Sequence, residues 1–284
     1  MGLLSGLGEL GLGKMEGAKL YEDTKQAKPE AKKEEKPAEK PFDENDWLFD
    51  KSCECVMCHE KFTYRAVRTG KARLIGTDPD LRPRYDKIDP LKYDVICCPR
   101  CGYSAITKYY TGITAGQAKL VKEAVTGKVH GLNNSGVLSY DDAFKRYQVA
   151  LVCSIAKKGK TSEKAYTALK MAWCLRGKKE TYPVDAPNYE EVMKECRDNE
   201  QEALKAAYDG FIQARSEENF PIAGMDTSTY DYLLAELAYR FNEYDTAGRF
   251  ISGILTSSSA NPRIKDKARD LKDRIVETKK MMQQ

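Results

Sequence analysis

Residues Asp94–Ala105 read "DVICCPRCGYSA" and place three cysteines within five positions. Cys98 and Cys101 form a Cys-x-x-Cys pair, a spacing that turns two sulfurs toward the same side of a tight turn. Pro99 fixes φ inside this turn, and Gly102 can adopt the left-handed backbone that closes it. The stretch therefore predicts half of a metal site.

A second pair, Cys55 and Cys58, lies in "CVMCHEKF", with Val56 in the position of the proline and His59 in that of the glycine. Two such turns supply the tetrahedron of thiolates that Zn²⁺ prefers, at about 2.3 Å from each sulfur. A redox or disulfide role and another metal are the alternatives. The sequence predicts one Zn²⁺ bound by Cys55, Cys58, Cys98 and Cys101.

The other cysteines do not fit this site. In an extended strand Cys97 and Cys98 point to opposite faces, so only one of them can face the metal. Cys53 is too close to Cys55 for a turn of this kind. Four thiolates leave no open coordination position, which makes the predicted zinc structural rather than catalytic. The remaining cysteines are expected to be buried in helices: Cys153, Cys174 and Cys196.

Composition indicates a soluble chain. Its 284 residues are 41% hydrophobic, and no apolar run approaches the roughly 20 residues of a membrane span. The start lacks the features of a secretory signal, so we expect a cytoplasmic protein, where paired cysteines bind metals more often than they form disulfides. The formal charge is +4, and the basic excess is largest within residues 51–108.

Three segments differ in composition. Residues 1–41 combine a Gly/Leu-rich start with "KQAKPEAKKEEKPAEKP", and are expected to form a disordered tail and charged linker. The Gly/Leu part could instead fold against a partner or the protein's own body. Residues 42–112 contain the cysteine pairs and the strand candidates "FTYRAVR", "ARLIG" and "KYDVICC", which predict a zinc-ribbon-like domain.

Residues 113–284 predict a helical domain. Ser139 caps a helix whose buried face is expected at Ala143, Tyr147, Ala150, Leu151 and Ile155. Further helices are predicted over residues 163–176, closed by Gly177, and over residues 188–218, 227–241, 245–255 and from Pro262 onward.

The segment 227–255 resembles a tetratricopeptide repeat, with Leu234, Ala238, Ala247 and Ile251 at the expected spacings but Asp231 where Trp is usual. A plain helical bundle is the alternative. The predicted fold class is therefore α+β, mostly α: a small β-rich zinc ribbon followed by an antiparallel array of helical hairpins.

The middle of the chain resembles the bacterial domain-of-unknown-function family numbered 2225. The resemblance lies in "CVMCHEKF", "KARLIGTDPDLRPRY", "DPLKYDVICCPRCGYSA" and the pair Tyr109-Tyr110. It implies a zinc ribbon followed by helical repeats and brings no known activity.

Two functions are open. The first is a non-enzymatic adaptor that binds a protein or peptide partner through its helices. The second is nucleic-acid binding, with Tyr64 as a stacking surface and phosphate contacts from Arg65, Arg68, Lys71 and Arg73. An enzyme is disfavoured because the chain has only two histidines, and "GKTS" at residues 159–162 lacks the first glycine of a phosphate loop.

Overall fold

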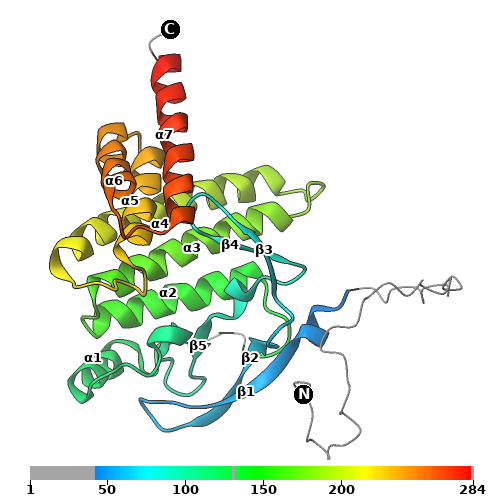
Figure 1. Cartoon of the computed structure of the whole chain (residues 1–284). Helices are drawn as coiled ribbons and strands as arrows, with labels where there is room; N and C mark the ends of the chain where they lie inside the picture. The colour runs from blue at the N-terminus through cyan, green and yellow to red at the C-terminus, as the bar shows by residue number, and fades with distance from the viewer. Residues whose placement is uncertain (1–41, 130–131, 133, 283–284) are drawn as a thin grey trace, which may run out of the picture. The chain divides into compact units, whose positions relative to one another are not determined.

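The computed structural model describes residues 42–129, 132 and 134–282 (Figure 1). From Phe42 onward the chain forms one compact unit. The tail and linker predicted for residues 1–41 lie outside the described residues. None of the described helices is both long and apolar enough to span a membrane.

The β-structure consists of three antiparallel pairs of strands, β1–β2, β3–β4 and β5–β6. Each pair is a hairpin of consecutive strands, and short 3-10 helices flank the first and third pairs. The bounds are η3 Glu44–Trp47, β1 Leu48–Glu54, β2 Lys61–Val67, β3 Arg73–Thr77, β4 Pro83–Asp86, η4 Pro90–Tyr93, β5 Val95–Cys97, β6 Ser104–Ile106 and η5 Thr107–Tyr109.

Helices make up the remainder of the described chain. Thr114 and Ser139 form capping boxes with Gln117 and Asp142, so both helix starts are set by local sequence. The bounds are α1 Ala115–Val125, α2 Tyr140–Ala156, α3 Thr161–Thr181, α4 Tyr189–Glu217, α5 Thr227–Arg240, α6 Tyr244–Thr256 and α7 Pro262–Met282. The predicted fold class, α+β and mostly α, is confirmed.

Two helix predictions are wrong in detail. α3 continues past Gly177 to Thr181, because this glycine lies against the ring of Tyr140 rather than at a helix end. A Cβ at residue 177 would lie 2.4 Å from Cε1 of Tyr140. On α2, Ala143, Tyr147 and Ala150 are buried as predicted, but Ile155 is 58% exposed.

The strand predicted over "KYDVICC" is shorter than expected. Pro90–Tyr93 forms η4, and only Val95–Cys97 is strand. The alternation within that strand is confirmed: Val95 and Cys97 pack in the main core with the helices, while Ile96 and Cys98 belong to a second core around the cysteine pairs.

These two cores join the β-rich and helical regions. The main core combines β5 and β6 with α2 to α7, and the second combines both cysteine pairs with residues from α1 and α2. In Figure 1 the β5 strand accordingly lies beside α2. The division at residue 112 into two domains stays a prediction, and so does a tetratricopeptide array, although α5 and α6 pack as a hairpin around Leu234, Ala238 and Ala247.

Candidate metal centre and partner surfaces

The two cysteine pairs lie at the tips of two hairpins with the same local geometry. In the β1–β2 hairpin the N–H of Cys55 donates to the carbonyl of Glu60, and the N–H of His59 donates to the carbonyl of Cys55, both at 2.9 Å. In the β5–β6 hairpin Cys98 donates to Tyr103 at 2.9 Å. Each connection therefore closes through the same pattern of backbone hydrogen bonds.

The fifth position of each turn has a left-handed backbone. Gly102 has φ +76°, and His59 has φ +58° at the equivalent position of the other turn. Glycine accommodates this conformation without cost, whereas a residue with a Cβ is strained there. A Cβ at residue 102 would also lie 2.8 Å from Cβ of Val129. The second turn is thus the better formed of the two, as its sequence predicts.

The hairpins bring four sulfur atoms together. The Sγ atoms of Cys55 and Cys101 are 3.6 Å apart, and those of Cys58 and Cys98 are also 3.6 Å apart. All four sulfurs lie within 4.8 Å of one another. A disulfide would require about 2.05 Å, whereas four thiolates around one Zn²⁺ lie about 3.8 Å apart. The cluster therefore has the size and donor set of a tetrahedral zinc site.

The protonation of the thiols shows why this cluster favours a cation. A hydrogen bond from the Cys101 thiol lowers the pKa of Cys55 to about 4 and raises the pKa of Cys101 well above its ordinary value. Burial raises the pKa of Cys98 to about 11. Because like charges repel in a buried space, a full set of thiolates needs a bound cation. A metal ion would replace the protons that these thiols share.

Groups around the cluster stabilise thiolates. The N–H of Met57 donates to Sγ of Cys55 at 3.4 Å. Tyr110 is 1% exposed, and its hydroxyl beside Cys55 also lowers the pKa of that thiol. Tyr110 is held by Tyr103, whose hydroxyl donates to the Tyr110 carbonyl at 3.1 Å. The pair Tyr109-Tyr110 was part of the family resemblance, but the place of Tyr110 in the core around the cysteine pairs could not be read from the sequence.

Residues near the cluster in sequence lie outside it. Cys97 packs in the main core, and Sγ of Cys53 contacts the carbonyl of Glu54. The His59 side chain is 79% exposed, and its Nδ1 lies 3.3 Å from the Glu54 carboxylate. Within the described residues, Cys55, Cys58, Cys98 and Cys101 alone form a group of potential metal ligands.

The residues predicted to form a nucleic-acid surface do not share one exposed surface in the structure. Tyr64 is only 5% exposed, so the prediction that it provides a stacking surface is wrong. Arg65 pairs with Asp50 at 3.1 Å and donates to the carbonyl of Gly136 at 3.2 Å. Its side chain is 14% exposed. The other predicted contacts are exposed and lie between the end of β2 and the first residue of β3: Arg68, Lys71 and Arg73.

A groove of about 680 Å³ runs along the helical region between α4, α5 and α6. Its polar groups are largely paired: Arg215 forms two hydrogen bonds with Asp231, at 2.7 and 2.9 Å, and lies over the ring of Phe250. Ile212 is 39% exposed at its edge. Arg249 donates to the hydroxyl of Thr246 at 3.1 Å, and the hydrogen bond and charge of Lys279, together with the charge of Arg249, lower the pKa of Asp245. The groove thus combines apolar surface with the carboxylates of Asp209 and Glu243 and with Arg249, which has no ion pair within 4.0 Å among the described residues.

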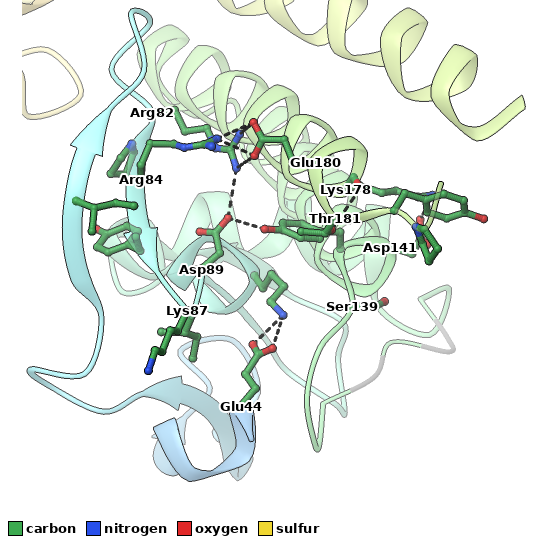
Figure 2. A pocket seen from close by; sticks show the side chains of 18 residues that line it. Glu44, Arg82, Arg84, Lys87, Asp89, Ser139, Asp141, Lys178, Glu180 and Thr181 are labelled. Carbon is green, nitrogen blue, oxygen red and sulfur yellow. Dashed lines mark hydrogen bonds and ion pairs between the residues drawn. The ribbon is translucent and has the colours of Figure 1, made fainter. Parts of the chain in front are cut away.

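A second cavity, of about 560 Å³, lies between β4 and the ends of α2 and α3 (Figure 2). Figure 2 shows Arg82 and Arg84 converging on Glu180, with nitrogen–oxygen distances of 3.1 and 2.6 Å. Asp89 accepts a hydrogen bond from the Tyr140 hydroxyl at 2.9 Å. The charged groups of this wall are mostly satisfied by one another, which indicates a structural role.

The motif "DPDLRPRY" continues this network into the core. Asp80 is fully buried and accepts hydrogen bonds from both terminal nitrogens of Arg176, at 3.0 and 2.7 Å, and from the indole of Trp173. Arg176 also binds Glu200 of α4 through Nε at 2.8 Å. The loop before β4 is thereby tied to α3 and α4. The sequence contained this charged motif, but its partners lie about 100 positions away.

A family model described as "Uncharacterized protein conserved in bacteria (DUF2225)" matches residues 48–275. No curated protein and no solved structure matches the chain at a significant level. The matched residues include both hairpins of the four-cysteine cluster, the buried ionic network and the α4–α6 groove. Because this family model spans most of the chain, the protein belongs to the family described as Uncharacterized protein conserved in bacteria, DUF2225.

Proposed function

We propose that the protein is a zinc-stabilised, non-enzymatic adaptor that binds a segment of a partner protein through its helical region. The observation that carries the proposal is the groove between α4, α5 and α6, which has the volume and mixed lining of a binding site. Stacked helical hairpins commonly present such grooves to peptides. A reducing compartment such as the cytoplasm suits this use of cysteine.

The four-cysteine cluster supports a structural role for the metal. Four thiolates would fill the tetrahedral shell of Zn²⁺ and leave no position for a substrate or an activated water. Their donated charge would also weaken the metal as a Lewis acid. Because the cluster lies in a core shared by the β-hairpins, α1 and α2, zinc would hold these elements together.

The side chains that line the groove indicate which kind of partner segment would bind there. Ile212 and Phe250 offer a contact for a large apolar side chain, and Arg249 offers an ion pair to a carboxylate. Arg215 is already paired with Asp231. It would therefore pack against the partner segment without forming a new ion pair. We therefore expect a partner segment that presents one apolar side chain and one acidic side chain to α4 and α6.

Photo-crosslinking at the groove tests the adaptor function. A benzoyl-phenylalanine placed at Ile212 in the full-length chain, expressed in its native host, should crosslink to a defined protein. The same group at Ile155, which is exposed on α2, serves as the matched control. The Arg249→Glu change in the Ile212 crosslinker background should reduce the yield, because it reverses the charge that attracts the carboxylate. Equal crosslinking from both positions, or none from Ile212, would overturn the proposal.

A further inference from the structure

A second surface, separate from the groove, lies on the β3–β4 hairpin. All five residues of β3 are exposed, including the apolar Leu74 at 56% and Ile75 at 63%. β3 pairs only with β4 in the described chain, so its other edge has free backbone N–H and C=O groups. Figure 1 shows β3 on the outer side of β4, away from α3. The edge is therefore accessible for pairing.

The local geometry places one aliphatic side chain beside a cavity. The pairing of β3 with β4 shifts between Leu74 and Gly76, which makes Ile75 the extra residue of a bulge. Ile75 lines the 560 Å³ cavity, whose other wall is formed by the end of α3. An added strand could thus pair with the backbone of β3 while one of its side chains contacts Ile75.

Positive charge gathers at the same end of the hairpin. Arg68, Lys71 and Arg73 precede or begin β3, and Lys87 follows β4; all four are exposed. None of them has an ion pair within 4.0 Å to an acidic group of the described residues, unlike most cations lining the cavity. Figure 2 shows Lys87 without a marked partner. A ligand at this edge would meet four cations that form no such ion pair, with Asp86, opposite Arg73 in the hairpin, as their acidic neighbour.

From these observations we propose that the β3 edge binds an extended acidic segment of a partner protein, with alternating aliphatic and carboxylate side chains, as an added strand. Backbone pairing supplies affinity in this mode, and side-chain contacts supply specificity. The aliphatic pair Leu74-Ile75 would meet the apolar side chains, and the four cations would meet the carboxylates. This surface stands independently of what binds in the α4–α6 groove.

Two other occupants fit less well. Single-stranded nucleic acid binds through stacking on aromatic side chains, whereas the exposed apolar residues of β3 are aliphatic and Tyr64 is buried. A second copy of the chain, paired antiparallel through β3, would bring Asp78 toward the cations. Asp78 already forms ion pairs with Arg82, Arg84 and Arg176. Its carboxylate would therefore attract the cations of a second copy only weakly.

The test uses the full-length, metal-loaded protein and the labelled peptide Glu-Val-Glu-Val-Glu-Val-Glu, followed by fluorescence anisotropy. We expect saturable binding that weakens at least about tenfold in Ile75→Lys and in Lys71→Glu/Arg73→Glu. Ile155→Lys is the matched control, because Ile155 is similarly exposed at 58% on α2. Ile212→Glu should also leave binding unchanged, which separates this edge from the groove.

Several outcomes would overturn the proposal. These are no binding of the acidic peptide, equal binding of the matching Lys/Val peptide, and full affinity in both β3 variants. Tighter binding of single-stranded DNA, falling steeply with salt, would assign the edge to nucleic acid instead. A concentration-dependent dimer in sedimentation, abolished by Ile75→Lys, would assign it to a second copy.

Discussion

Replacing Asp80 with asparagine removes one charge from the centre of the buried ionic network. The carboxylate is fully buried and accepts from Arg176 at 3.0 and 2.7 Å and from Trp173 at 3.2 Å. An amide at residue 80 keeps one acceptor but turns an N–H₂ group toward the guanidinium. Breaking one partner of a buried ion pair costs about 3–5 kcal/mol. Because Arg176 keeps Glu200 and Asp78 as partners, we expect about 3 kcal/mol.

Urea unfolding monitored by circular dichroism measures this effect. The Asp80→Asn variant should unfold at a lower midpoint with an unchanged slope. Asp266→Asn is the control, since its ion pair with Arg269 is exposed and is expected to contribute less than about 1 kcal/mol. A loss below about 1 kcal/mol in Asp80→Asn, equal to that of the control, would refute the assignment of this network as a structural tie.

The pH dependence of the free energy of unfolding provides a second test of the buried ionic network. Burial raises the pKa of Asp80, but the hydrogen bonds and charge of Arg176, together with Arg240, outweigh it and hold the pKa below the ordinary value of 3.8. A group with a depressed folded pKa stabilises the protein above its unfolded pKa, and this stability is lost as pH falls through the folded pKa. The stability difference between wild type and Asp80→Asn should therefore be constant near neutral pH and shrink below about pH 4.

Three further predictions concern single residues. Gly177→Ala should destabilise the protein by about 1–2 kcal/mol in urea unfolding, because the new Cβ would clash with the Tyr140 ring. The control Gly248→Ala, at an open helix surface, should be neutral or stabilising. Equal effects of the two substitutions would contradict this packing. His59→Gly should keep the full metal content, since His59 points away from the sulfurs toward Glu54; a loss of metal would show that it is a ligand. Tyr110→Phe should weaken Zn²⁺ binding in a chelator competition, because the hydroxyl beside Cys55 favours its thiolate; unchanged affinity would remove Tyr110 from the site's support.

The parts of the structure that were predictable from sequence are those set by short-range rules. The Cys-x-x-Cys spacing determines a turn within six residues, and alternation along β5 determines that Cys97 and Cys98 face opposite cores. Capping residues such as Ser139 likewise mark a helix start from neighbours alone. The fold class follows from these local signals, and the convergence of the two cysteine pairs follows from the four ligands that Zn²⁺ requires.

The parts that could not be predicted depend on contacts between distant segments. Gly177 resembles a helix end, but its small size is required by Tyr140 on another helix. Tyr64 shares one face of its strand with Phe62 and Ala66, but only the fold places that face against the core of the cysteine cluster rather than in solvent. Asp80 and Arg176 are 96 positions apart, and nothing local to either residue identifies its partner. Tertiary packing decides these positions, whereas sequence spacing identifies the candidate metal ligands.

Metal analysis of the purified full-length protein measures whether one zinc ion holds the two hairpins together. We expect one zinc per chain, lost in Cys98→Ser/Cys101→Ser and retained in the matched variant Cys97→Ser/Cys153→Ser. Substitution with Co²⁺ should give the charge-transfer absorption of a tetrahedral thiolate site. Absence of zinc, or full retention after Cys98 and Cys101 are both replaced, would contradict it.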